Sequence, residues 1–265
     1  MTNLDELLII ARAAVDKGSQ LLKTVEPGKI TAKDDRDFVT DLDVRIQETV
    51  REYLYKKTPE IGFLGEEQVD HEESSGERRY RWILDPIDGT SNFIHGIPLC
   101  AVSLALADND NPAIGVISAP FLKLEYHASV GRGAFSNGSR IKTSHTTNLG
   151  DSIVSIGDYA VGIAAAEKNR RRFAVTTALA NKVERVRMFG SAALDLAWVA
   201  EGRIDACVLL SNKPWDTAAG VLIARESGAV VTDSDGNEHN LTSAHTIAAS
   251  SAIASSLLDL IATTA

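Results

Sequence analysis

Hydrophobic positions in the N-terminal part of the chain follow the period of a helix. From residue 4 to residue 24, apolar side chains recur every three or four residues, and the same spacing returns between Val39 and Tyr55. A period of about 3.6 residues predicts two amphipathic helices, the second of which ends before Pro59. Residues 29–37 between them are polar and charged with no period, so we expect an exposed, mobile loop there.

In the middle of the chain the pattern changes to short apolar segments separated by turn residues. The separators, which include DNDNP, APFLK and GRGAFSNG, have the chemistry of turns. A polar stretch at 68–81 reads as a loop, and residues 90–95 as a short helix. The segments between the separators predict strands at 61–64, 82–84, 101–107, 113–118 and 125–130.

The C-terminal part mixes both element types. The pattern predicts strands at 153–156, 206–209 and 229–232, and helices at 167–181, 191–201, 218–227 and 251–262. Because helices and strands come in blocks, we expect a layered α/β (α+β) fold with the arrangement αβαβα. The 265 residues contain no internal repeat and no Pro-, Gly- or Ser-rich linker, so we predict a single domain, residues 1–265, with a soft division near residue 145.

Composition narrows the classes of partner. Lys and Arg total 27 against 36 Asp and Glu, a net charge of −9, which argues against nucleic acid or an anionic membrane as partner. Two basic runs, at 78–81 and 170–172, are interpreted as solvated faces. The two cysteines have no paired spacing, and neither a secretory leader nor a bilayer-spanning apolar run is found. We therefore expect a cytoplasmic protein.

Three acidic clusters suggest the chemistry. Each follows a short apolar segment: Glu66 and Glu67 after IGFL, Asp85 and Asp88 after WIL, and Asp216 after ACVLLSNKP. Each acid alone could cap a turn. Three groups of acids at strand ends, without basic neighbours in the sequence, instead call for cations. Oxygen ligands without His or Cys indicate Mg²⁺ or Mn²⁺ rather than zinc.

Gly89 and Thr90 sharpen this interpretation. Glycine permits a close backbone approach, and free amides at the start of a short helix favour an anion such as phosphate. An aspartyl-phosphatase pattern is excluded, because the spacing is Asp-x-x-Asp and Pro86 occupies the position of the nucleophile. A calcium loop at 233–237 is also rejected in favour of a hairpin turn, because its glycine falls too early.

Taken together, the motifs resemble a known family. Six motifs resemble those of the inositol monophosphatase family of Mg²⁺-dependent, lithium-sensitive phosphatases. They are GEE at 65–67, DPIDGTSNF at 85–93, WDTAAG at 215–220, DFVTDLD at 37–43, GAFSNG at 133–138 and RMFGSAA at 187–193. The likeness runs over nearly the whole chain. It implies the layered fold of the inositol monophosphatase and fructose-1,6-bisphosphatase type and, we expect, a homodimer.

The resemblance also implies a role for each matching residue. Glu66, Asp85 and the Ile87 carbonyl would hold one Mg²⁺, and Asp85, Asp88 and Asp216 a second, within a total of two to three ions. Thr90 and Asp43, with Glu66 nearby, would polarise the attacking water. The amides of Gly89 and Thr90 would hold phosphate oxygens, and residues 33–37 would form a loop that closes over the site.

One position departs from the family pattern. Inositol-type members are similar in carrying a Glu seven residues before the Trp-Asp aspartate, where this chain has Leu209. We therefore expect a small phosphate ester of a sugar, aminosugar, nucleoside, amino alcohol or polyol, contacted by Asp88, Ser191, Ala192, Leu209 and Lys213. The alternatives are an inositol-1-phosphate or histidinol-phosphate phosphatase, or a non-catalytic, metal-gated regulatory homologue.

Overall fold

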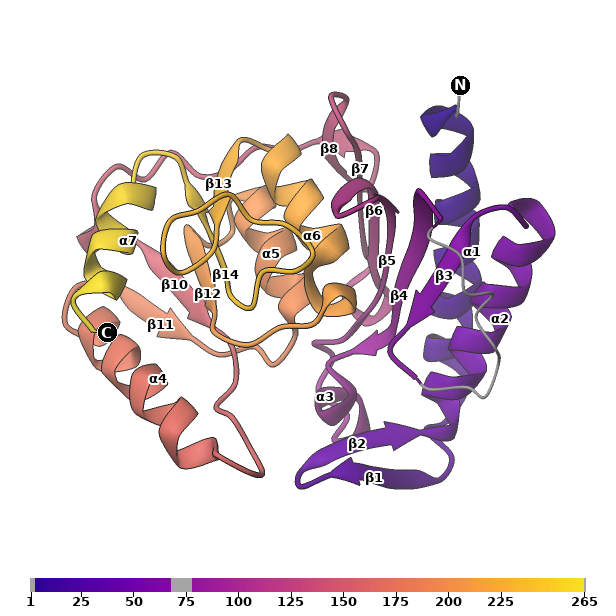
Figure 1. Ribbon diagram of the computed structural model, residues 1–265, viewed down its shortest axis with the longest axis horizontal. Coiled ribbons are helices and arrows are strands. Elements are labelled where there is room, and N and C mark those ends of the chain that lie inside the picture. The colour runs from indigo at the N-terminus through magenta and orange to yellow at the C-terminus, as the bar shows by residue number, and fades with distance from the viewer. Residues whose placement is uncertain (1–2, 68–77, 265) are drawn as a thin grey trace.

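Two sheets alternate with three layers of helices in the computed structural model, which describes residues 3–67 and 78–264 (Figure 1). Helices α1 (Leu4–Thr24) and α2 (Asp41–Lys57) cover the outer face of one sheet. Helices α5 (Ala192–Glu201) and α6 (Pro214–Glu226) lie between the two sheets, and α4 (Ala165–Ala180) and α7 (Ala254–Ala262) cover the far face of the second sheet. The predicted αβαβα arrangement is confirmed.

The larger sheet has seven strands in sequential order, and only its first pair is parallel. Its strands are β3 (Gly62–Gly65), β4 (Tyr80–Asp88), β5 (Ala101–Asp108), β6 (Asn111–Ala119), β7 (Leu124–Ser129), β8 (Gly133–Ser136) and β9 (Ser139–Arg140). The smaller sheet has five strands: β11 (Arg185–Arg187), β10 (Ile153–Ile156), β12 (Ala206–Leu209), β14 (Thr246–Ser250) and β13 (Ala229–Thr232), in spatial order. Its strands β10, β11 and β12 run parallel.

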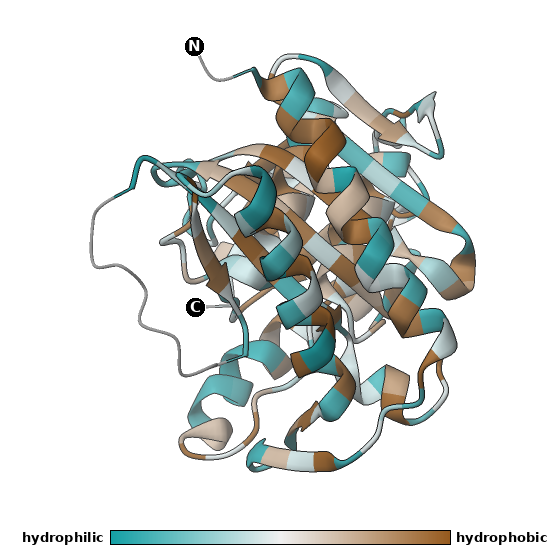
Figure 2. Ribbon diagram, turned by 90° about the vertical axis from the view of Figure 1, so that its right-hand side faces the viewer, coloured by the Kyte–Doolittle hydropathy of each residue, from teal (hydrophilic) through white to brown (hydrophobic). Residues whose placement is uncertain are grey.

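The layers are joined by three groups of buried apolar side chains. One packs α1 and α2 against the large sheet, one packs α5 and α6 between the sheets, and one packs α4 and α7 against the small sheet. Figure 2 faces α1 and α2, whose ribbons alternate between apolar and polar residues as the sequence period predicts. Asn3 caps α1, and Thr40 with Asp43 forms a capping box on α2. Both helix predictions are confirmed.

The expectation of an irregular loop at 29–37 is wrong. Residues Ile30–Asp34 (β1) and Asp37–Thr40 (β2) form an antiparallel hairpin, although β1 is exposed throughout as predicted. Arg36 has a positive φ of 57° at the turn. Residues of high β-propensity at 30–31 and 38–39 pair across this turn. The mostly charged residues between them left no continuous strand pattern in the sequence.

Several boundaries and elements also differ from the predictions. Strand β4 continues to Asp88, GRGAFSNG contains β8, and α6 begins at Pro214 rather than at residue 218, because proline suits the first helical position. Strands β9, β11 and β14 were not predicted. Residues 68–77 of the polar stretch lie outside the described residues. The turn at 233–237 is confirmed: the Asp233 carboxylate accepts from the amides of Asp235 and Asn237.

The remaining helices are short. They are α3 (Thr90–Ile94), which was predicted, and the 3₁₀ turns η1 (Pro120–Leu122) and η2 (Leu149–Asp151). Within the described part of the chain, no helix combines the length and apolarity that crossing a membrane requires.

Candidate active site

Strand β4 carries two of the predicted acids into the interior. Asp85 and Asp88 are 3% and 6% exposed near its carboxyl end. Between them, three steps of β4 lie opposite two steps of β5, with Asp85 facing Ser103 and Asp88 facing Ala101. Pro86, which has no N–H to donate, falls within this bulge. The extra residue allows two acids three positions apart to point to the same side of the sheet.

Asp85 has the surroundings of a cation ligand. Its Oδ1 atom is buried and has no hydrogen-bond partner among the described residues. Burial raises the pKa of Asp85 well above its usual range, and the charges of Glu66, Asp88 and Asp216 raise it further. A buried carboxylate without a donor and among other acids is stabilised by a divalent cation. These oxygen donors therefore fit the Mg²⁺ that the family resemblance implies.

Asp88 is fixed by the first turn of α5. Its carboxylate accepts from the Ser191 hydroxyl and from the amides of Ala192 and Ala193, the latter two at 3.1 Å. Burial nevertheless raises the pKa of Asp88 to about 7, although the hydrogen bond from Ser191 opposes the shift. The structure thus brings together three of the residues predicted for the site, Asp88, Ser191 and Ala192.

Asp216 lies in the first turn of α6. Pro214 begins the helix, and the Asp216 Oδ2 atom accepts from the Lys213 amide at 2.7 Å. Burial raises the pKa of Asp216 to about 7, against this hydrogen bond. The charge of Glu66 also raises it, so the acid of α6 lies near the acids of the large sheet. Asp216 therefore joins Asp85 and Asp88 across the boundary between the two halves of the chain.

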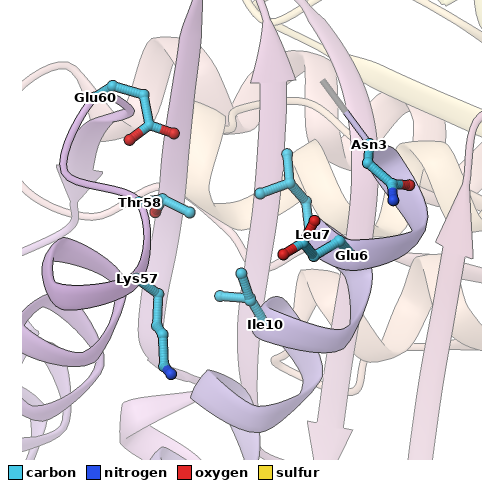
Figure 3. Close-up of a pocket in the computed structure, with 7 residues that line it drawn as sticks. All are labelled: Asn3, Glu6, Leu7, Ile10, Lys57, Thr58 and Glu60. Carbon is cyan, nitrogen blue, oxygen red and sulfur yellow. The ribbon is translucent and has the colours of Figure 1, made fainter. Parts of the chain in front are cut away.

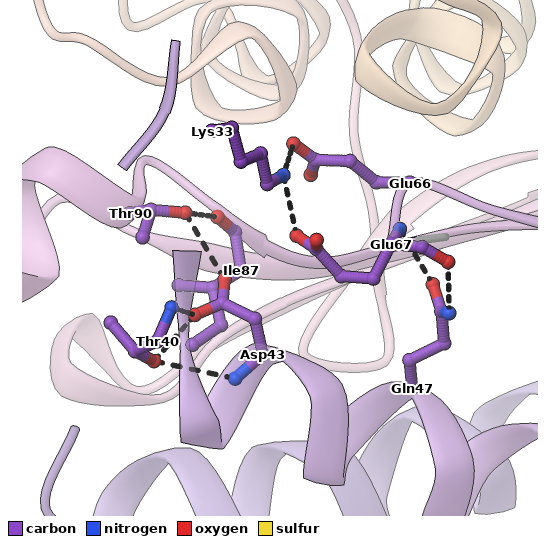
Figure 4. Close-up of polar contacts among 8 residues, drawn as sticks. All are labelled: Lys33, Thr40, Asp43, Gln47, Glu66, Glu67, Ile87 and Thr90. Atoms are coloured by element: carbon purple, nitrogen blue, oxygen red, sulfur yellow. Dashed lines mark hydrogen bonds and ion pairs between the residues drawn. The ribbon is translucent and has the colours of Figure 1, made fainter. Parts of the chain in front are cut away.

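Glu66 and Glu67 follow β3 and meet the β1–β2 hairpin (Figure 4). The Lys33 Nζ atom lies 2.8 Å from Glu66 Oε1 and 2.7 Å from Glu67 Oε1. Burial acts to lower the pKa of Lys33, but the charges and hydrogen bonds of the two carboxylates outweigh it and raise this pKa above its usual value. One ammonium cannot compensate two acids, and burial raises the pKa of Glu67 to about 7.

The Lys33 ammonium group is therefore the positive charge next to Glu66 in this structure. In the ranges 3–67 and 78–264, no three acidic, histidine or cysteine side chains are gathered so as to hold a metal ion as they stand. Gln47 fixes the backbone of Glu67 through hydrogen bonds of 2.6 and 3.0 Å. Gly65 makes this approach feasible, because a Cβ atom there would lie 2.0 Å from Gln47 Oε1.

A hydroxyl–carboxylate pair lies next to β4 (Figure 4). The Thr90 Oγ1 atom is 3.2 Å from Asp43 Oδ1 and 2.8 Å from the Ile87 carbonyl oxygen. The other carboxylate oxygen of Asp43 accepts from the Thr40 amide and hydroxyl at 2.9 and 2.5 Å. Burial raises the pKa of Asp43, although these hydrogen bonds oppose the shift. The predicted association of Thr90 with Asp43 and Ile87 is thus present.

Gly89 places the start of α3 against the site. Its φ is +90°, and a Cβ atom there would lie 2.8 Å from the Leu99 carbonyl oxygen, so only glycine fits without strain. Asn92 holds the same helix by donating to the Leu99 and Phe189 carbonyl oxygens at 2.8 and 2.7 Å. This geometry is compatible with phosphate contacts from the amides of Gly89 and Thr90, which stay a prediction.

The two remaining substrate candidates lie at the end of β12 and the start of α6. Leu209 is only 3% exposed and belongs to the core between the sheets, whereas Lys213 is exposed. A Cβ atom on Gly157 would lie 3.2 Å from Leu209 Cδ2. Leu209 thus packs against the neighbouring strand end, and its role toward a substrate stays a prediction.

A separate pocket of about 380 Å³ lies between the start of α1 and the end of α2 (Figure 3). Its lining residues are Asn3, Glu6, Leu7, Ile10, Lys57, Thr58 and Glu60. None of them was predicted as a site residue, and none is among the acids described above.

Sequence reasoning missed the supporting residues of the site. Gln47, Asn92 and Asp195 carry no motif signal of their own, although Asn92 stands within DPIDGTSNF. Asp195 is 1% exposed, and burial raises its pKa well above the usual range. The paired glycine and asparagine of the motif could have indicated a tight backbone approach, whereas nothing local signals the long-range contact of Gln47 with Glu67.

The layered fold and its acid-lined site define a class of metal-dependent phosphatase, and comparison with known proteins agrees. The chain matches the Inositol monophosphatase family over residues 3–265. It is 38% identical over 205 residues to a fructose-1,6-bisphosphatase/inositol-1-monophosphatase of Thermotoga maritima, covering 77% of this chain and 75% of the relative. It is 36% identical over 258 residues to an inositol-1-monophosphatase of Mesorhizobium japonicum, covering 95% and 94%.

A solved structure supports the same assignment. The extragenic suppressor protein suhB from Bartonella henselae superposes with a TM-score of 0.88 at 32% identity, covering 97% of this chain and 98% of that chain. The chain therefore belongs to the inositol monophosphatase family. This membership supports a metal-dependent phosphatase that acts as a phosphoric monoester hydrolase.

Proposed function

We propose that the chain hydrolyses the phosphate monoester of a small metabolite with water activated by Mg²⁺. The observation that carries this proposal is Asp85, whose buried Oδ1 has no partner among the residues described and whose neighbours are Asp88, Asp216 and Glu66. When bound there, Mg²⁺ would lower the pKa of a water molecule and neutralise phosphate charge. The Ile87 carbonyl would complete the ligand set with these acids.

The residues of the chain would position and deprotonate the water. The single proton of the Thr90 hydroxyl has two acceptors, the Ile87 carbonyl oxygen at 2.8 Å and Asp43 Oδ1 at 3.2 Å, so the oxygen lone pairs stay available to accept a hydrogen bond from water. Asp43 is buried and its pKa is raised, which suits it to receive a proton through Thr90. The amides of Gly89 and Thr90 would hold phosphate oxygens, and the fixed Asp88 and Ser191 would border the leaving group.

The direct test is phosphate release from a panel of phosphomonoesters. We expect turnover with Mg²⁺, loss of turnover with a chelator, and inhibition by Li⁺. Full turnover after exhaustive chelation would overturn the metal-dependent proposal, and no release from any ester would favour a non-catalytic homologue. Thr90→Val should lower kcat by about 100-fold, a typical contribution of positioned proton transfer. Ser91→Ala, on the neighbouring exposed residue of α3, is the matched control.

The substrate and the assembly belong to the same proposal. We expect inositol 1-phosphate to be a poor substrate, because the apolar Leu209 accepts no hydrogen bond from a hydroxyl and each unpaired hydroxyl costs roughly tenfold in kcat/KM. A higher kcat/KM for inositol 1-phosphate than for the other esters would contradict this. The protein would act in the cytoplasm as a homodimer, without nucleic acid or membrane partners. Light scattering after gel filtration tests the dimer.

A further inference from the structure

Asp158 is a carboxylate that the proposed mechanism does not use. It follows β10, whose parallel neighbour β12 ends at Leu209. Ile156 lies opposite Val208, and the Gly157 amide donates to the Val208 carbonyl oxygen at 3.0 Å. The carboxyl ends of parallel strands meet at one edge of a sheet. Asp158 therefore lies at the edge from which the chain runs through residues 210–213 to Asp216.

The charges around Asp158 connect it to the site. Asp195 lies one turn into α5, and its amide donates to the Ser191 carbonyl oxygen at 3.0 Å. The pKa of Asp195 is raised chiefly by burial and further by the charges of both Asp88 and Asp158. Asp158 is thus near the same end of α5 that holds Asp88. This is the end that would border the leaving group.

The loop that carries Asp158 is held in place. The Ala160 amide and carbonyl both pair with the Asn169 side chain of α4, at 2.7 and 2.9 Å. The Tyr159 ring packs on Phe173 with centroids 4.7 Å apart. At the far end of the loop, a Cβ atom on Gly162 would lie 3.8 Å from Asp34 Oδ2 of the β1–β2 hairpin. The loop before α4 and the hairpin therefore meet (Figure 1).

The Asp158 carboxylate has no side-chain or backbone partner among the residues that the structure describes. Asp158 is an exposed residue, although partial burial raises the pKa of its carboxyl group. Across residues 3–67 and 78–264, no hydrogen bond or ion pair to its side chain is found. A hydroxyl would satisfy such a carboxylate only as a hydrogen-bond donor, whereas an ammonium group would also compensate its charge.

We propose that Asp158 is a specificity-determining residue that binds an ammonium group on the leaving group of the substrate. In this chain Leu209 offers no acceptor at the end of β12, and Asp158 supplies a carboxylate from the adjacent strand end instead. The substrate class is then the phosphate ester of an amino alcohol or aminosugar. This inference rests on the proposed phosphatase function and narrows it.

The test compares matched esters in the presence of Mg²⁺. Aminoethyl, aminopropyl and aminobutyl phosphate are each assayed beside the counterpart of equal length that ends in a hydroxyl or a methyl group. We expect at least one amino ester to exceed its methyl counterpart by about tenfold or more in kcat/KM, the range of a hydrogen bond to a charged group. Asp158→Asn should reduce that ratio about tenfold.

Asp151→Asn is the control, because it removes the same charge from an exposed position at the opposite end of β10. It should leave the amino-to-methyl ratio unchanged. A ratio near one at every length, an equal preference for the hydroxyl esters, or an unchanged ratio in Asp158→Asn would each overturn this inference alone. If no phosphomonoester is hydrolysed, the proposed function fails and this inference fails with it.

Discussion

Neighbouring acids of the site have opposite local environments. Asp88 accepts three hydrogen bonds from the start of α5, whereas Asp85 Oδ1 has no partner in the described part of the chain. Substituting each acid separately can therefore distinguish a role in metal binding from a role in holding the start of α5. Asp85 would serve the ion alone, and Asp88 would serve both the ion and the fold.

We predict that Asp85→Asn abolishes turnover but stabilises the metal-free protein. The raised pKa of Asp85 means that the folded state disfavours its ionised form, so the stability cost grows as pH rises and Asn removes it. Turnover should fall about 1,000-fold or more. With chelator at pH 8, Tm should rise by a few degrees, since about 1 kcal/mol corresponds to roughly 2–4 °C at this size.

Asp88→Asn is the comparison variant. It places an amide donor among three donors, and the unsatisfied buried groups cost about 1–3 kcal/mol. Both variants remove a charge that the folded state disfavours, so the metal-free Tm of Asp88→Asn should lie below that of Asp85→Asn. Its turnover should fall as well. Equal Tm changes in the two variants, measured by scanning fluorimetry with chelator, would contradict the separate roles of these acids.

His239 gives a second prediction at the residue scale. It is 1% exposed, its Nε2 atom is 2.8 Å from Thr246 Oγ1, and burial followed by the charge of Arg225 lowers its pKa from 6.5 to about 4. Between pH 6.5 and about pH 4, His239 binds a proton in the unfolded chain but not in the folded chain. Its contribution to the free energy of unfolding is therefore complete above pH 6.5 and is lost as pH falls toward 4.

The loss from His239 should reach the order of 3 kcal/mol. Urea unfolding at pH 7 and at pH 4.5 should show a smaller decrease for His239→Gln than for wild type. His95→Gln, on the exposed histidine that follows α3, is the control. The same pH sensitivity in all three proteins would exclude His239 as its source.

At the scale of elements, the β1–β2 hairpin is the element that the sequence pattern predicted least well. Strand β1 is exposed throughout and β2 passes from exposed Asp37 to buried Thr40, so no alternation of buried residues marked them. Lys33 contacts acids 33 and 34 residues away. The acids themselves were predictable, because each follows an apolar strand and shares a motif. The contacts of Lys33 and Gln47 with Glu66 and Glu67 join segments that are far apart in the sequence, so no local pattern predicts them.

We predict that Lys33 anchors the hairpin in the metal-free protein. Lys33→Met breaks both ion pairs, so amide hydrogen exchange at residues 30–40 should accelerate roughly three- to tenfold, as about 1 kcal/mol would produce. Lys29→Met, an exposed lysine just before β1, should leave the exchange unchanged. Equal exchange in wild type and Lys33→Met would assign the anchoring to the backbone pairing of the hairpin.

The whole molecule is organised around a core that both halves share. The layered order followed from the blocks of helix and strand, and the soft boundary near residue 145 is crossed by the core between the sheets. Ile83 and Ile117 from the large sheet pack in the same cluster as Leu194 of α5 and Leu222 of α6. Strand β14 pairs with β12 and β13 and completes the small sheet. It was not predicted, because its short run of small residues shows no hydrophobic period.

We therefore predict that the chain unfolds as a single cooperative unit. Trp82 packs with the helices of the first layer and Trp198 with the core between the sheets, so each reports on one half. Variants that retain only Trp82 or only Trp198, with Phe at the other two tryptophans, should show coincident urea midpoints by fluorescence. Circular dichroism should follow the same transition. A fragment of residues 1–145 would expose one face of the large sheet, and we expect it not to fold alone. Two separated midpoints, or a folded fragment, would instead make the boundary near residue 145 a true domain border.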